Sequence, residues 1–363
     1  MKVNIVSYED LGVWILGKFA RKLNEEVNRA GIQCSIGKAP DPQADINHHI
    51  IYINYQCVAT NIDTLMITHI DTLHKFQLLR RQLAVARMGV CMSRENQMKL
   101  IAEGAPADRL CYINPAHDEV MRPRPLTLGL TVKVHSDGRK NENSMLDLCA
   151  AISPEDFRFI IMGSGWQSVV EAMRKKGFQV EYYDDFNYET YKEIVPKFDY
   201  FLYTAHDEGS MGFMDALSAG VQTIVSPQGY HLDAPGGITH AVSDTAQLIS
   251  VCREIAAKRR KLIASVADWT WPNYARKHID LWQYLLKPGQ PLSITVPGCR
   301  DGLASLISPE NAPRSSIAER LSYKLGLLKN INRTIYNYFP DANGGVLDFL
   351  GKAFNRFKKL LSR

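Results

Sequence analysis

The sequence predicts an α/β protein with two domains, each a parallel sheet covered by helices on both faces. Three observations carry this prediction. The chain has 363 residues, enough for two domains of ordinary size. Strand-like apolar runs alternate with helical spacing, which favours parallel strands joined by helices. The segment Arg122–Pro125 (RPRP) interrupts the alternation and predicts a linker, so we expect two Rossmann-like halves that face a cleft.

The first half is expected to begin with a buried strand, Lys2–Tyr8, followed by an amphipathic helix over 13–30 that Gly31 closes. Apolar runs then predict further strands, with helical spacing between several of them. The expected strands are His49–Ile53, Leu65–Thr68, Met88–Met92 and Leu110–Ile113, and the expected helices are 73–87 and 94–103.

The second half repeats this alternation after the linker. The expected strands are Leu130–His135, Phe157–Met162, Val180–Tyr183, Asp199–Thr204 and Gln222–Ser226, and the expected helices are 144–152, 166–176, 188–195, 212–219 and 244–259. Because ligands of such sheets bind at the carboxyl ends of the strands, we expect the functional residues there.

Composition excludes several classes of protein. Hydrophobic residues make up 45% and charged residues 22% of the chain, which is typical of a globular protein. No run approaches the roughly 18–20 apolar residues of a membrane span. The first residues lack the apolar core of a signal peptide, and the seven cysteines show no paired spacing. We therefore expect a cytoplasmic protein in a reducing compartment, without a zinc site or disulfides.

The positive charge is concentrated at the C-terminal end. Arg314–Arg363 contains ten Lys/Arg and three Asp/Glu, whereas the whole chain carries only +5, so we expect no nucleic-acid partner for the body. Gly344–Arg363 places its apolar residues on one helical face and its basic residues elsewhere, the pattern of a helix on an anionic membrane. The alternative is a helix that packs on the protein itself or on a partner.

A stretch rich in glycine and acidic residues, His206–Tyr230 (HDEGSMGFMDALSAGVQTIVSPQGY), begins where an expected strand ends. A strand, a glycine-rich turn and a helix N-terminus together present free backbone N–H groups and the positive end of a helix dipole, which suit a diphosphate. Carboxylates repel phosphates, so Asp207 and Asp215 are better suited to accept hydrogen bonds from sugar hydroxyls. The combination favours a nucleotide-sugar site, and an ordinary α/β loop is the alternative.

This stretch resembles the donor-site signature of retaining glycosyltransferases of family 4, in which seven residues separate two acidic residues and a small-residue helix ending in Gly follows. Asp207 and Asp215 fit that spacing, with aspartate instead of the usual glutamate, and Glu208 is the alternative for the first position. The resemblance implies that Asp207 or Glu208 contacts the donor sugar and that Asp215 contacts the ribose. The expected diphosphate contacts at the helix start are Gly209, Ser210, Met211 and Gly212.

The segment His135–Asn143 (HSDGRKNEN) resembles the place where the family carries an Arg and, five positions later, a Lys that clamp the donor diphosphate. Arg139 fits the first position, but Ser144 occupies the second. Lys140 is the expected substitute, as a mobile point charge, whereas Arg139 suits bidentate binding. The alternative is a solvent-exposed basic turn.

Two further motifs resemble the same family. His69, in Met66–Asp71 (MITHID), matches a strand-end His that approaches the donor sugar from the first domain, although a strand-end His is more often structural. Gly163 and Gly165 match a small-residue loop that faces the nucleotide, although glycine-rich turns are common.

The segment Trp269–Leu286 resembles the final helix of the family, which crosses back to the first domain. The resemblance thus covers about residues 1–286 and implies the two-domain GT-B architecture. The expected divisions are an acceptor-side domain (1–121), a nucleotide-sugar-binding domain (122–268), the returning helix (269–286), a linker (287–316) and a basic amphipathic helical tail (317–363).

The resemblance therefore implies a retaining hexosyltransferase of the bacterial surface-polysaccharide type. It would transfer a sugar from a nucleoside-diphosphate sugar to a hydroxyl of a glycan acceptor, expected to be lipid-linked in lipopolysaccharide or capsule synthesis, at the inner face of the cell membrane. The chain lacks an Asp-x-Asp metal signature, and we expect neither a metal nor a cofactor. An inverting enzyme or a sugar-nucleotide epimerase on the same scaffold, and a non-catalytic membrane-tethering subunit, stay open as alternatives.

Overall fold

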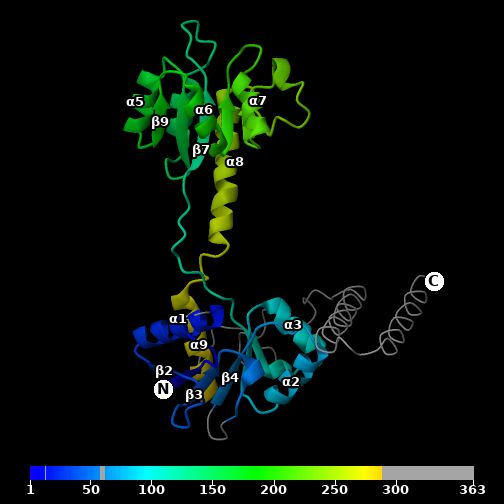
Figure 1. The fold of residues 1–363 in the computed structure, drawn as a ribbon. Helices are drawn as coiled ribbons and strands as arrows, with labels where there is room; N and C mark the ends of the chain where they lie inside the picture. Colours follow the sequence, from blue (N-terminus) through cyan, green and yellow to red (C-terminus); the bar gives the residue numbers. More distant parts are fainter. Residues whose placement is uncertain (13, 58–61, 288–363) are drawn as a thin grey trace, which may run out of the picture. The chain divides into compact units, whose positions relative to one another are not determined.

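The computed structural model describes residues 1–287 apart from 13 and 58–61. These residues divide into two compact units (Figure 1). Among the described residues, unit 1 contains Met1–Asp118 and Asp268–Lys287, and unit 2 is Glu119–Ala267. The predicted tail and all but the first residue of the predicted linker lie outside the described residues. Within the described part of the chain, helices long and apolar enough to cross a bilayer are absent.

Unit 1 is built on a six-stranded parallel sheet with the order β2-β1-β3-β4-β5-β6. Its strands are β1 (Lys2–Val6), β2 (Gln33–Gly37), β3 (Ile46–His49), β4 (Ile62–Ile67), β5 (Met88–Cys91) and β6 (Leu110–Tyr112). Its helices are α1 (Ile15–Arg29), α2 (Leu73–Leu83), α3 (Arg94–Ala102) and α9 (Trp271–Leu286).

Side-chain alternation along the strands of unit 1 fills two cores, one on each face of the sheet. Met66 of β4 packs in the core beneath α1 and α9, whereas its neighbours Leu65 and Ile67 pack in the core beneath α2 and α3. Both faces of the sheet are therefore covered by helices, which explains why the strands have apolar residues at successive positions.

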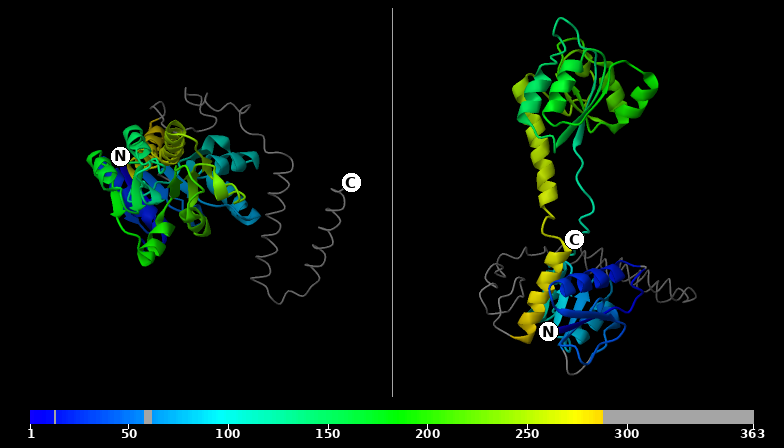
Figure 2. Two further views of the ribbon diagram at one scale, coloured as in Figure 1. Left: turned by 90° about the horizontal axis from the view of Figure 1, so that it is seen from above. Right: turned by 90° about the vertical axis from the view of Figure 1, so that its left-hand side faces the viewer.

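Helix α9 completes the core of unit 1 although it follows unit 2 in the sequence. It lies alongside α1 (Figure 2), and the ring of Trp271 meets that of Phe19 edge-on at 5.4 Å. The indole N–H of Trp271 donates to Asp118 (2.9 Å), which also pairs with Lys18 of α1. Trp282 is fully buried beneath the same face of the sheet.

Unit 2 is built on a second six-stranded parallel sheet with the order β12-β11-β10-β7-β8-β9. Its strands are β7 (Leu126–Thr131), β8 (Phe157–Met162), β9 (Val180–Tyr183), β10 (Tyr200–Tyr203), β11 (Gln222–Val225) and β12 (His240–Ala241). Its helices are α4 (Ser144–Ala151), α5 (Gln167–Lys175), α6 (Tyr188–Ile194), α7 (Met211–Ser218) and α8 (Thr245–Ala264).

Unit 2 also has a helical layer on each face of its sheet (Figure 1). Leu202 of β10 packs in the core beneath α4, α5 and α8, whereas Phe201 and Tyr203 pack in the core beneath α6 and α7. The prediction of an α/β protein with two parallel sheets is confirmed.

Several predicted strands are wrong in position. The strand expected at Leu130–His135 is β7, which begins four residues earlier because Leu126 pairs with Phe157 of β8. The strand expected at His49–Ile53 is β3, which ends at His49 before a 3₁₀ turn, Tyr52–Asn54. Strands β2 and β12 were not expected at all, since neither has the apolar run that marks a central strand.

Candidate functional site

The sheet of unit 2 has a topological switch point between β7 and β10. The chain passes from β7 to β8 and β9 on one side and then returns to β10 on the other, so the segments that leave β7 and β10 diverge. Ligands of open α/β sheets bind at such a point, outside the carboxyl ends of the strands. One backbone hydrogen bond, from His206 N–H to the carbonyl of Arg139 (2.9 Å), joins the two segments there.

Lys140, Tyr203 and Asp207 form a hydrogen-bonded cluster at this switch point. The Lys140 ammonium pairs with the Asp207 carboxylate and donates to the Tyr203 hydroxyl (2.7 Å). The Tyr203 hydroxyl in turn donates to Asp207 (2.8 Å), and the Gly209 N–H donates to the same carboxylate (3.1 Å). The Lys140 side chain is only 10% exposed, so its charge is screened less by solvent than that of a surface lysine.

The surroundings of Asp207 keep it ionised. Burial acts to raise the pKa of this carboxyl, but hydrogen bonds from Lys140, Tyr203 and the Gly209 N–H outweigh burial and hold the pKa below its usual value. Burial, and then the hydrogen bond to Asp207, raise the pKa of the Tyr203 hydroxyl. The cluster therefore contains a fixed positive charge, a fixed negative charge and a neutral phenol.

Arg139 lies next to the cluster but faces solvent. Its side chain is 44% exposed, and its guanidinium lies 3.2 Å from a ring nitrogen of His135 and 3.7 Å from Asp137. The loop after β10, residues 206–210, carries Asp207 and Glu208 and is called the acidic loop below. The structure thus brings Lys140, rather than Arg139, against the acidic loop. Ser144, at the position where the resemblance implies a lysine, is buried at the start of α4 and donates to the Asn141 carbonyl (2.6 Å).

The start of α7 comes close to β7. A Cβ on Gly212 would collide with the Thr131 hydroxyl at the end of β7, so glycine is required for this approach. Ser210 is buried at the N-cap position, whereas Met211 is 68% exposed. Glu208 is exposed, and its backbone carbonyl leaves no room for a Cβ on Gly229 of the facing turn.

Asp215 lies one turn further along α7 and is held by a tyrosine. The Tyr191 hydroxyl of α6 donates to its carboxylate (2.6 Å). Burial, followed by this hydrogen bond, raises the pKa of Tyr191, so the phenol stays protonated and acts as the hydrogen-bond donor to the carboxylate. Each of the two aspartates of the predicted signature thus accepts a hydrogen bond from a largely buried tyrosine.

Gly163 and Gly165 lie in the loop after β8 and pack against the segment that leaves β7. Both have positive φ (136° and 92°). A Cβ on Gly163 would strike the Val132 carbonyl, and one on Gly165 would lie 2.9 Å from the Val134 side chain. These glycines therefore bring the two loops together at the carboxyl end of the sheet, and the structure gives them a packing role.

His69 belongs to unit 1, where it follows the end of β4. Its side chain is 71% exposed, 3.5 Å from the Lys75 ammonium and 4.0 Å from Asp71. Asp71 pairs with Lys75 at 2.7 Å. His69 is thus a solvent-facing side chain of its own unit.

Tyr203, Tyr191 and His231 take part in this arrangement but were not predicted from the sequence. Tyr203 lies in an apolar strand run, where a tyrosine indicates only core packing. Tyr191 lies on a short helix with an ordinary amphipathic pattern. His231 ends Ser226–His231 (SPQGYH), a segment whose pattern favours a turn over a lining of the base or sugar pocket. Local sequence patterns carry no signal for such contacts between separate elements.

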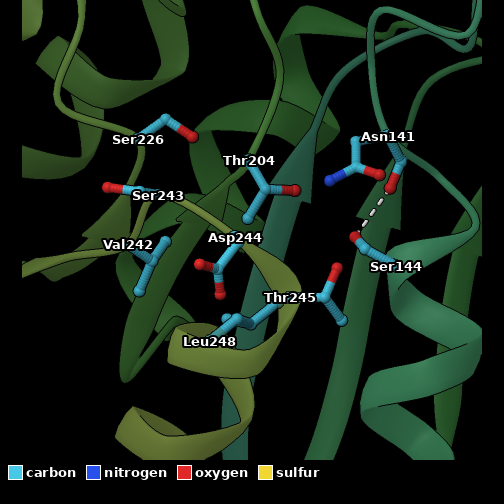
Figure 3. A pocket seen from close by; sticks show the side chains of 9 residues that line it. All are labelled: Asn141, Ser144, Thr204, Ser226, Val242, Ser243, Asp244, Thr245 and Leu248. Carbon is cyan, nitrogen blue, oxygen red and sulfur yellow. Dashed lines mark hydrogen bonds between the residues drawn. The ribbon is translucent and has the colours of Figure 1, made fainter.

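A small polar pocket with a cavity volume of about 10 Å³, room for about one water molecule, lies beside the switch point (Figure 3). Thr204 and Ser226 line it from the ends of β10 and β11, and Asp244 lines it from the start of α8. Asp244 also caps α8 by accepting from the Gln247 N–H (2.8 Å). Hydroxyl groups and a carboxylate suit water or a neutral polar group and disfavour a diphosphate. The candidate anion site is therefore the Lys140 cluster.

No protein-family model and no curated protein matches the chain. Solved structures similar to it include HepE of Anabaena in complex with UDP and glucose (10% identity, 78% of this chain and 99% of that chain, TM-score 0.30). They also include the lipopolysaccharide outer core galactosyltransferase WaaB (13% identity, 77% of this chain and 98% of that chain, TM-score 0.32). A third is WaaG, a glycosyltransferase involved in lipopolysaccharide biosynthesis (13% identity, 78% of this chain and 97% of that chain, TM-score 0.32).

Proposed function

We propose that the chain is a glycosyltransferase that binds a nucleoside-diphosphate sugar in unit 2 and transfers the sugar to a hydroxyl of a glycan acceptor. One observation carries this proposal. A largely buried ammonium, a depressed-pKa carboxylate and a phenol meet at the switch point of a parallel sheet, beside the start of α7. The ammonium suits the diphosphate, and the carboxylates suit sugar and ribose hydroxyls.

In this proposal the enzyme acts by stabilising the charge that develops on the leaving diphosphate. Lys140, with Arg139 at the rim and the backbone N–H groups at the start of α7, would neutralise that charge without a metal. Asp207 or Glu208 would orient the sugar ring, and Asp215 the ribose. Retention of configuration is proposed from the sequence resemblance of 207–220, with the leaving phosphate accepting the proton of the acceptor hydroxyl.

The acceptor is proposed to be a lipid-linked glycan because the C-terminal sequence is basic and amphipathic. At about 1 kcal/mol for each basic residue near an anionic leaflet, four to six charges suffice for reversible attachment. Deleting residues 340–363 is therefore expected to release the protein from anionic liposomes while turnover on a soluble acceptor is kept. Sedimentation of the shortened chain with the liposomes would place the membrane contact elsewhere.

A thermal-shift panel with UDP, GDP, dTDP, CMP and ADP tests the proposed donor site. A nucleotide at 100 times its dissociation constant stabilises a protein by about 2.7 kcal/mol, so one member of the panel is expected to raise the melting temperature visibly. The same nucleotide should leave Asp215→Ala unshifted. If the wild-type protein responds to none of the five, the non-catalytic alternative replaces the proposal.

A further inference from the structure

A fully buried histidine, His231, connects the acidic loop of unit 2 to the neighbouring strand. It ends the short 3₁₀ turn Gly229–His231 and has 0% of its surface exposed. Its Nε2 accepts a hydrogen bond from the Ser210 N–H (2.9 Å), at the start of α7. Its Nδ1 lies 3.1 Å from the carbonyl of Ser226, directly after β11.

The two partners of His231 determine its tautomer. A backbone N–H can only donate and a carbonyl can only accept, so Nε2 must carry no hydrogen and Nδ1 must carry one. The imidazole is therefore neutral. A second proton on the ring, or a ring flip, would remove one of the two hydrogen bonds, so both bonds depend on one ring orientation.

The ring of His231 also occupies space that only a glycine leaves free. A Cβ on Gly209 would lie 3.0 Å from the ring, and Gly209 has a positive φ of 117°. The ring packs on Phe213 of α7 at 4.3 Å and meets the ring of Tyr203 edge-on at 5.6 Å. His231 is thus fixed by ring packing as well as by hydrogen bonds.

The residues held by His231 are the ones that hold the Lys140 cluster. Gly209 donates its N–H to Asp207 (3.1 Å), and its carbonyl oxygen lies 3.3 Å from the Tyr203 hydroxyl. Both Asp207 and Tyr203 bind Lys140. A shift of His231 would therefore move Gly209, and with it the carboxylate and phenol that set the place of the ammonium.

We propose that His231 is a positioning residue for the donor site. Its neutral imidazole holds Ser210 and Gly209, and through Gly209 it fixes Asp207, Tyr203 and Lys140 in the geometry that receives a nucleoside diphosphate. This inference rests on the proposed function of that site. Because His231 is fully buried, it acts through these neighbours rather than by touching the donor.

Three substitutions at His231 test this role by their hydrogen-bonding capacity. His231→Leu removes both bonds, whereas His231→Gln supplies one acceptor and one donor on a single amide. His231→Asn carries the same amide on a shorter side chain, which cannot reach both partners, and it serves if the leucine variant does not fold. The matched control is His240→Leu on β12, whose ring lies near Tyr200, the first residue of β10.

Binding of UDP, GDP, dTDP and ADP is measured by calorimetry, together with the melting temperature of each variant and with kcat and KM where turnover is detected. His231→Leu and His231→Asn are expected to weaken binding of the preferred nucleotide by at least about tenfold, which corresponds to about 1.4 kcal/mol. His231→Gln is expected to restore most of the affinity. The control should bind as the wild-type protein does.

Each outcome decides between a positioning role and a merely structural one. If His231→Leu melts earlier but binds the nucleotide with the wild-type dissociation constant, His231 only supports the fold and the proposal is overturned. Equal losses in the glutamine and leucine variants would likewise overturn it, since hydrogen bonding would then be irrelevant. If the wild-type protein binds none of the nucleotides, the proposed function itself fails, and the role of His231 falls with it.

Discussion

Replacing Lys140 by methionine is expected to lower turnover by about 10²–10³-fold, the loss typical when one preorganised charge-stabilising group is removed from a transition state. Methionine keeps the length and most of the volume of the side chain but cannot neutralise a leaving diphosphate. Since Lys140 is one of the groups that hold the pKa of Asp207 down, its loss should also raise that pKa. The rate should therefore fall further in acid than it does in the wild-type enzyme.

Initial rates with a nucleoside-diphosphate sugar, measured between pH 5 and 8, check this expectation. The control is Lys192→Met, the same substitution in unit 2 at a lysine whose ion pair with Glu189 (2.8 Å) lies on the surface. The control should keep both the rate and its pH profile. Near-normal turnover of Lys140→Met would show that the diphosphate binds elsewhere, with Arg139 as the next candidate.

Unit 1 is expected to lose stability as the pH falls from about 6.5 to about 4, because two buried histidines face each other under α9. The rings of His48 on β3 and His278 on α9 meet at 4.9 Å, and both are fully buried. Burial lowers the pKa of His278 to about 4 and, with the neighbouring His278 and His49, lowers that of His48. The unfolded chain therefore binds more protons in this window, and protonation favours unfolding.

For His278 alone this linkage is worth about 3 kcal/mol of unfolding free energy across the window. Urea unfolding at several pH values measures it, and a Trp166→Phe background leaves tryptophans only in unit 1, at positions 14, 269, 271 and 282. His278→Phe, which keeps an aromatic ring beside Trp282, should flatten the dependence on pH. Parallel curves for both proteins would show that other groups, such as His48 or carboxylates, and not His278, cause the loss in acid.

The sequence pattern was most informative where turn residues bound a strand closely at both ends. The strands at Phe157–Met162 and Val180–Tyr183 were predicted with their observed limits, because Gly163 follows the first run and Asp184 follows the second. Around β7 the alternation of LTLGLTVKV continues past Thr131, so only the pairing with β8 determines where the strand lies. In β3 the buried residues include Asn47, His48 and His49, whose polarity hides the strand.

The candidate site was predictable as a set of loops but not as a set of contacts. Strand, glycine and carboxylate patterns indicated the loops after β7 and β10. These patterns could not tell whether Arg139 or Lys140 reaches the acidic loop, since neighbouring residues of one turn point in different directions. Tyr203 and His231 act across separate elements, and their roles depend on how α7 approaches β7 and β11, which no local pattern encodes.

The position of α9 in the core of unit 1 has a consequence for synthesis of the chain. Trp271 packs against α1 and Trp282 against β3 and β4, but the ribosome makes both only after all of unit 2. Unit 2 is contiguous from Glu119 to Ala267, so it can fold as soon as it emerges. Until α9 has been made, the apolar face of β1, β3 and α1 is without its cover. Unit 1 is therefore begun first during synthesis but completed last.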